Sequence, residues 1–148
     1  STPTTAMKSV ALEVPYEIPF CSRQDYLYAA DVGAAFGIAA TAPFTGYGVF
    51  TLPSRTVDTA EFVTTIHHAA NDLGLAANFG ITVGTEEVPF ICDLEYEPFL
   101  HAFPDTPHTP LADAISESLE VFRMQRERGW LKAEIATLID CGDTAGVK

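Results

Sequence analysis

Two kinds of hydrophobic pattern alternate along the chain. In the first, short runs of alternating or continuous apolar residues are rich in aromatic and β-branched side chains, which is typical of strands. These runs predict strands at residues 16–20, 24–29, 46–52 and 79–84. The run at 46–52, GYGVFTL, is nearly all apolar, as expected of a strand that is covered on both faces of a sheet.

The second pattern, apolar residues every three to four positions, is typical of amphipathic helices. It predicts helices at residues 2–14, 31–41, 57–74 and 109–129, and a short helix or turn at 93–103. The clearest helix is the last long one, where Thr109 is the expected N-cap and Pro110 takes the first helical position. Its acids lie early and its arginines late, before Gly129, which agrees with the helix dipole. For the first helix we expect Thr2 to be the cap.

Acidic residues stand at the starts of two other predicted helices. Asp58 with Glu61 resembles a capping box, and Gly74 is expected to end that helix. Asp31 follows an aromatic run directly and opens the helix 31–41. A carboxylate there can accept backbone N–H bonds and contribute about 0.5–2 kcal/mol. We therefore expect Asp31 to be a cap, with a catalytic acid as the alternative.

Composition and charge exclude some classes of partner. The 148 residues are 47% hydrophobic, enough for one domain with a substantial core. A formal net charge of −12 repels phosphate backbones and anionic lipid, so we expect no nucleic acid and no membrane partner. The three cysteines form no CxxC pair, which favours a reducing cytoplasm. We expect the tail 132–148 to be partly disordered.

The sequence lacks the common cofactor-binding and catalytic motifs. There is no G-x-G-x-x-G turn, no P-loop and no tyrosine followed by lysine at the fourth position. Adjacent His67 and His68 lie about 100° apart on a helix and cannot share one metal ion. A zinc site at His101, Asp105 and His108 is a low-ranked alternative, because turn chemistry explains that proline-rich loop better. Cys92 is expected to be an inert buried thiol. We predict no catalytic, cofactor-binding or metal-binding residue in this chain.

Three sequence motifs, taken in their order along the chain, resemble those of a known enzyme family. QDYLYAADV at 24–32 is followed by VFTL at 49–52, with Asp58 and Glu61 beyond it, and TPLADAISESLEVFR at 109–123 comes last. Together they resemble the C-terminal part of extended short-chain dehydrogenases/reductases, the NAD-dependent epimerase/dehydratase family. The resemblance covers residues 3 to about 131. The chain departs from the family pattern at Ala30, at Thr51 and in the position of Arg23.

The resemblance implies an α/β fold, α+β-like as an isolated piece, in which short strands alternate with helices. Residues 1–131 would be the C-terminal substrate-binding region of an extended Rossmann-type enzyme. The complete enzyme would use NAD or NADP for hydride transfer on a sugar, nucleotide sugar or polyol; this chain, lacking the N-terminal half, would bind no cofactor alone. Whether it belongs to an enzyme therefore rests on the resemblance.

The resemblance also implies which residues would bind substrate. They are Arg23, Gln24, Tyr26, Arg55 in the loop after the strand 46–52, and the loop 86–96. For Arg23 a surface or salt-bridging role is an equal alternative, because a shift of one residue in a regular strand moves a side chain to the other face.

A different class of function is also open. A region that lacks its Rossmann half would expose an apolar face, and such surfaces usually have partners. The alternative is thus a non-catalytic binding or assembly module. It would bury this face in a homodimer or against a separate N-terminal Rossmann half.

Overall fold

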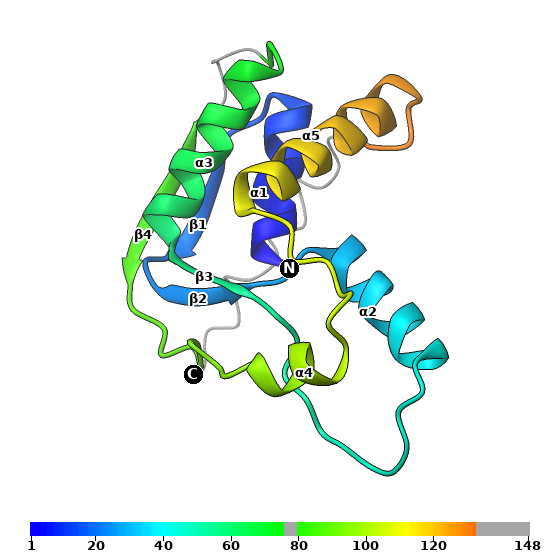
Figure 1. Cartoon of the computed structure of the whole chain (residues 1–148). Helices are drawn as coiled ribbons and strands as arrows, with labels where there is room; N and C mark the ends of the chain where they lie inside the picture. Colours follow the sequence, from blue (N-terminus) through cyan, green and yellow to red (C-terminus); the bar gives the residue numbers. More distant parts are fainter. Residues whose placement is uncertain (76–79, 133–148) are drawn as a thin grey trace, which may run out of the picture.

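The computed structural model describes residues 1–75 and 80–132 (Figure 1). It is a mixed helix-and-strand structure, which confirms the expectation at that level. The elements are α1 (Thr2–Leu12), β1 (Tyr16–Phe20), β2 (Arg23–Tyr26), α2 (Ala29–Thr41), β3 (Arg55–Asp58), α3 (Thr59–Asp72), β4 (Ile81–Glu86), α4 (Glu97–Ala102) and α5 (Leu111–Glu127). In this part of the chain no helix has both the length and the hydropathy that a membrane span requires.

The four strands form two separate pairs. β1 pairs in parallel with β4, and β2 pairs antiparallel with β3. In the antiparallel pair, which we call the β2–β3 ribbon, Tyr26 lies opposite Arg55 and Arg23 lies opposite Asp58. Because side chains alternate along a strand, Gln24 and Tyr26 face one side of the ribbon and Arg23 the other.

The main core is formed where α1, α3 and α5 pack over the β1–β4 pair (Figure 1). Its fully buried side chains are Ala6, Val10, Ile18, Phe62, Ile66, Ile115 and Leu119. The expected apolar face of α3 supplies much of this core. The helix ends in a Schellman motif, in which Gly74, at φ 65°, donates to Asn71 and Leu75 donates to Ala70.

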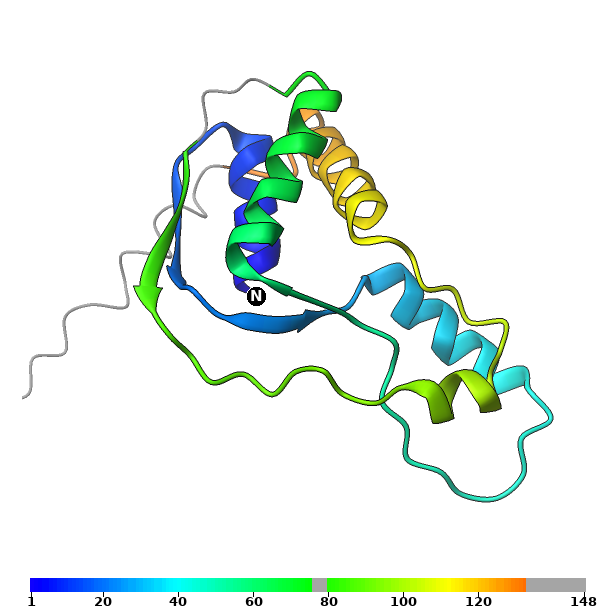
Figure 2. The same ribbon diagram turned by 60° about the vertical axis from the view of Figure 1, so that its left-hand side comes forward.

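A smaller apolar cluster lies apart from this core. α2, α4 and the connection between α2 and β3 extend together from one side of the body, as both ribbon views show (Figures 1 and 2). Ala35, Phe99 and Phe103 are buried among them, with Phe50 and Leu52 packed against the cluster. The rings of Phe50 and Phe103 meet edge to face at 5.6 Å. We call this the distal cluster.

The predicted strand at 46–52 is wrong. These residues form no strand, and the side chains of Tyr47 and Val49 are 90% and 81% exposed. The physical reason is that a strand needs a neighbour to satisfy its backbone, and within the described residues no other strand lies alongside this run. The strand forms instead at β3, in residues that the sequence analysis assigned partly to a loop.

The other elements are confirmed, with shifts of one to three residues at most of their ends. The N-caps differ: α1 is capped at Ser1 rather than Thr2, and α5 at Pro110 rather than Thr109. Asp58 occupies the N-cap of α3 but makes no side-chain capping bond. The tail that was predicted to be partly disordered lies, except for Lys132, outside the described residues. Phe79, the first residue of the predicted fourth strand, also lies outside them.

Candidate functional site

A cavity of about 490 Å³ lies between the β2–β3 ribbon, the start of α1 and one face of α5. We call it the ribbon cavity. Three of the four residues predicted to bind substrate, Gln24, Tyr26 and Arg55, line it. Apolar side chains, among them Phe62 and Phe122, form most of the remaining wall. A few polar groups on an apolar wall of this size are typical of small-molecule sites, whose volumes run from about 300 to 1,000 Å³.

Gln24 and Tyr26 are held together on the inner side of the ribbon. The Gln24 Nε2 donates a hydrogen bond of 2.7 Å to the Tyr26 hydroxyl. The Tyr26 ring stacks on Phe62, with 4.4 Å between centroids and 19° between planes. Burial raises the pKa of Tyr26, and the hydrogen bond from Gln24 offsets part of that rise. The phenol is therefore neutral at physiological pH and acts as a hydrogen-bonding group.

Arg55 is placed opposite Tyr26 on β3. Its Nη2 donates a hydrogen bond of 2.9 Å to the backbone oxygen of His108. Its Nε is buried and has no hydrogen-bond partner. Among residues 1–75 and 80–132 no carboxylate forms an ion pair with it. Arg55 therefore lines the cavity with no described carboxylate paired to it, and its buried Nε–H makes no hydrogen bond.

Asp31 does not cap α2, which corrects the expectation from the sequence. The N-cap is Tyr28, and Asp31 is the third helical residue. Its two carboxylate oxygens each accept a hydrogen bond of 2.7 Å from Thr109, one from the backbone N–H and one from the hydroxyl. Asp31 thus ties α2 to the segment that leads into α5 and holds two walls of the cavity together.

Tyr28 makes a second connection between the same walls. Its hydroxyl donates a hydrogen bond of 2.6 Å to the carboxylate of Glu117 on α5. This bond, with some desolvation, raises the pKa of Tyr28 to about 12. The cavity rim therefore has two polar links from the β2–α2 joint to α5.

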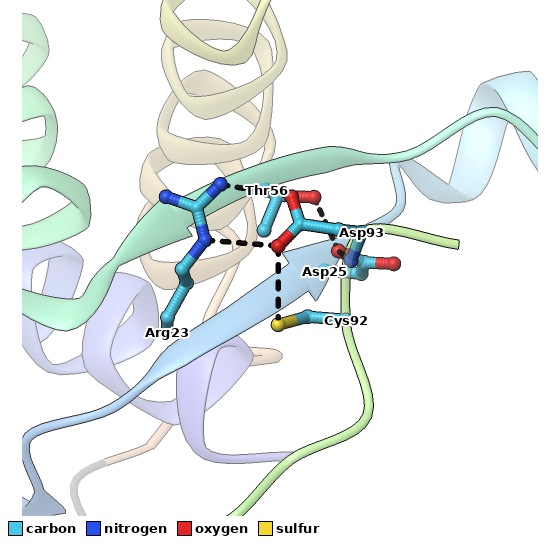
Figure 3. Close-up of polar contacts among 5 residues, drawn as sticks. All are labelled: Arg23, Asp25, Thr56, Cys92 and Asp93. Atoms are coloured by element: carbon cyan, nitrogen blue, oxygen red, sulfur yellow. Dashed lines mark hydrogen bonds and ion pairs between the residues drawn. The ribbon is translucent and has the colours of Figure 1, made fainter. Parts of the chain in front are cut away.

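Arg23 lies on the outer side of the ribbon and does not line the cavity (Figure 3). Its Nη2 and Nε donate hydrogen bonds of 2.8 and 3.2 Å to the two oxygens of Asp93, whose pKa this pairing lowers. Asp25 accepts hydrogen bonds from the Thr56 hydroxyl and the Asp93 backbone on the same side. The outer contacts fasten the 87–96 loop to the ribbon, which is the salt-bridging role that the sequence left open for Arg23.

Cys92 is partly exposed beside this ion pair, so the expectation of a buried thiol is wrong. Desolvation is the larger cause, and the nearby charge of Asp93 the next, that raises the pKa of Cys92, and the raised pKa keeps the thiol protonated. The loop 86–96 contributes nothing to the ribbon cavity. Part of it, from Asp93 to Tyr96, lines an open cavity of about 890 Å³ that also includes Arg55 and Thr56 of β3.

The histidines are spread over different surfaces. His67 and His68 are exposed on α3. His101 lies on α4, and the Nε2 of His108 is 3.1 Å from the backbone oxygen of Ser54. Within the described residues no three His, Cys, Asp or Glu side chains are grouped as metal ligands.

Some residues of the cavity were missed by the sequence analysis. Thr4 and Met7 from α1, and Ile115 and Ser118 from α5, belong to the lining. The contact of α1 with α5 in three dimensions places them at the ribbon, and nothing in the local sequence indicates it.

Comparison of the chain with protein-family models, curated proteins and solved structures gives no match.

Proposed function

We propose that this chain is the substrate-binding part of an NAD(P)-dependent sugar, nucleotide-sugar or polyol epimerase or dehydrogenase. The carrying observation is that Gln24, Tyr26 and Arg55, which the resemblance picks out, line one cavity. In the complete enzyme the resemblance implies that the other half holds the cofactor and the catalytic tyrosine. This chain would supply the walls that select the substrate.

The chemistry of the ribbon cavity supports a hydroxylated ligand. Gln24 and the neutral Tyr26 hydroxyl offer donor and acceptor capacity at one spot, and the surrounding wall is apolar. A sugar or polyol presents hydroxyl groups alternating with C–H surface, so both kinds of lining find a counterpart.

Calorimetry on the intact chain tests this function. A panel of sugars, polyols and nucleoside-diphosphate sugars is expected to include a ligand, whereas NAD(H) and NADP(H) are expected to give no binding heat. Tyr26→Phe removes the hydroxyl but keeps the ring on Phe62, and should weaken ligand binding about threefold to tenfold. Tyr47→Phe, at an exposed site outside the cavity, is the matched control and should change nothing. Tight binding of a nicotinamide cofactor by this chain alone would refute the proposal.

A second candidate is a non-catalytic assembly module, and one observation favours it. The distal cluster leaves large apolar side chains in solvent: Phe36 is 70% exposed, and Tyr47 and Val49 still more. Such a surface fits a homodimer or a separate Rossmann half, against which residues 46–52 would gain the neighbouring strand that they lack here.

Light scattering with increasing concentration, combined with binding of the dye ANS, tests the assembly module. Val49→Lys should reduce both association and dye binding. Val121→Lys places the same charge on α5, at a less exposed valine, and should leave both as they are. A wild-type chain that stays a monomer and binds no dye would remove this candidate.

A further inference from the structure

Basic side chains gather at the C-terminal end of α5, in a chain that is otherwise strongly acidic. Eight lysines and arginines stand against twenty acidic residues, yet residues 123–132 hold four of the eight and a single acid, Glu127. Arg126 is used within the fold, because it pairs with Glu13 and donates to the backbone oxygen of Ala11. The other three form no ion pair with a carboxylate in residues 1–75 and 80–132: Arg123, Arg128 and Lys132.

A tryptophan side chain lies in solvent among these charges. Trp130, the single tryptophan of the chain, is 70% exposed. A Schellman motif at the end of α5 fixes its backbone. Gly129, at φ 71°, donates to the backbone oxygen of Arg126, and Trp130 donates to that of Gln125. The next residue, Leu131, is buried. The indole is therefore held in solvent by an ordered backbone on both sides.

Arg128 and Met124 continue this surface along α5. The Arg128 guanidinium lies over the indole, with its Cζ 5.0 Å from the centroid of the Trp130 ring. A guanidinium stacked in this way keeps the N–H groups at its edge for a carboxylate, which it binds through two parallel hydrogen bonds. Met124 lies one turn before Arg128 and is 39% exposed. We call Met124, Arg128 and Trp130, with the flanking Arg123 and Lys132, the α5-end surface.

The α5-end surface is separate from the ribbon cavity. None of its residues lines that cavity. In both ribbon views the C-terminal end of α5 points away from α2 and α4 (Figures 1 and 2). A molecule bound at this surface leaves the cavity open, so the inference below goes beyond the proposed function and does not depend on it.

The helix dipole explains only part of this arrangement. It favours a cation in the last turn of α5, but it requires neither unpaired cations beyond that turn nor an exposed tryptophan. Tryptophan, methionine and arginine are enriched at protein–protein interfaces, and tryptophan and arginine carry much of the binding energy there.

We propose that the α5-end surface docks an acidic, amphipathic helix of a partner protein. The apolar face of that helix covers Trp130 and Met124, and its carboxylates pair with Arg128 and the flanking cations. Met124 and Arg128 are one turn apart, so a helix packed alongside α5 meets them with residues of the same spacing.

Charge complementarity selects an acidic partner of this kind. Charges more than about 8 Å away are largely screened at physiological ionic strength, so the nearby cations decide the sign of the attraction. A second copy of this chain is disfavoured, because both copies carry a net charge of −12 and repel each other.

The single tryptophan reports directly on this surface. The probe is a synthetic helical peptide with leucine on one face, glutamate on the other and no aromatic residue. Titrated into the intact chain, it should shift the fluorescence of Trp130 to shorter wavelength and saturate, because the indole leaves water. The same peptide with lysine in place of glutamate is the charge control and should leave the emission unchanged.

Variants assign the binding, which is then followed by the anisotropy of a dye-labelled glutamate peptide. Trp130→Ala should weaken binding at least about tenfold, and Arg128→Gln about threefold to tenfold. Arg128→Lys keeps the charge but loses the flat stack, and should weaken binding less than Arg128→Gln. His68→Glu, at an exposed position of α3, changes the net charge by the same one unit as Arg128→Gln and should bind as the wild type does.

Several results would overturn the proposal. They are the absence of a saturable shift with the glutamate peptide, equal binding of the lysine peptide, and wild-type binding by Arg128→Gln together with Trp130→Ala. A shift that grows with the concentration of the chain itself, without peptide, would assign the surface to a second copy. A shift with a single-stranded oligonucleotide but not with the glutamate peptide would assign it to nucleic acid. Each of these outcomes leaves the proposed function of the ribbon cavity to its own test.

Discussion

Replacing Phe62 by alanine should destabilise the protein strongly, because this side chain joins the core to the ribbon. Phe62 is 2% exposed, belongs to the main core and carries the Tyr26 ring on its face. Burying a phenylalanine and leaving a cavity in its place together set the cost of Phe→Ala in a core at about 3–5 kcal/mol. The stacked pair should account for about 0.5–1.5 kcal/mol of that loss.

Urea unfolding followed by far-ultraviolet circular dichroism measures this cost. Phe36→Ala is the matched control, because Phe36 is 70% exposed and should change the free energy of unfolding by less than about 0.5 kcal/mol. A double-mutant cycle of Phe62→Ala with Tyr26→Leu isolates the stacking energy. A loss below about 1 kcal/mol for Phe62→Ala, or an equal loss for Phe36→Ala, would refute the assignment of the core.

Three further predictions concern the joints of the fold. Asp31→Ala should cost about 1.5–3 kcal/mol in urea unfolding, because it removes two hydrogen bonds to a charged acceptor, while Glu120→Ala on the exposed side of α5 should cost little. The pKa of Tyr28 is raised to about 12 in the folded protein, from a value near 10 in the unfolded chain. The hydrogen bond to Glu117 therefore stabilises the protein fully below pH 10, and this stabilisation is lost as the pH rises toward 12. Tyr28→Phe should remove a step in tyrosinate absorbance near pH 12. Gly84→Ala should destabilise, because a Cβ there overlaps the backbone of β1, whereas Gly33→Ala, in open space within α2, should stabilise by about 0.5–1 kcal/mol in thermal unfolding.

The regular elements of the main body could be predicted from sequence because each is specified locally. The buried face of α3 and its stop at Gly74 follow from residues that are close along the chain. The same holds for α5, whose proline and arginines mark its two ends. The run at 46–52 shows the opposite case. Its composition is that of a buried strand, but whether it becomes one depends on a neighbouring strand, which periodicity cannot reveal.

The candidate site was predicted in part for a similar reason. Strand alternation separates Arg23 from Gln24 and Tyr26, and this could be foreseen as soon as the strand was assigned. The hydrogen bonds that Asp31 accepts from Thr109 join residues 78 positions apart, so this role could not be derived from the helix in which Asp31 lies. Likewise, the ion pair of Arg23 with Asp93, and the absence of a carboxylate paired with Arg55 among the described residues, depend on how loops return to the ribbon.

The most direct test of the proposed function is a map of the backbone amide resonances that shift when ligands bind to the intact chain. Nucleoside-diphosphate sugars and phosphorylated or acidic sugars are titrated, with NADH in parallel. We expect shifts that cluster at Gln24–Tyr28, at Arg55 and from Thr109 into α5, and no binding of NADH. Shifts that centre on the open cavity lined by Asp93–Tyr96, no binding by any of these sugars, or binding of NADH by this chain alone would contradict the proposed function.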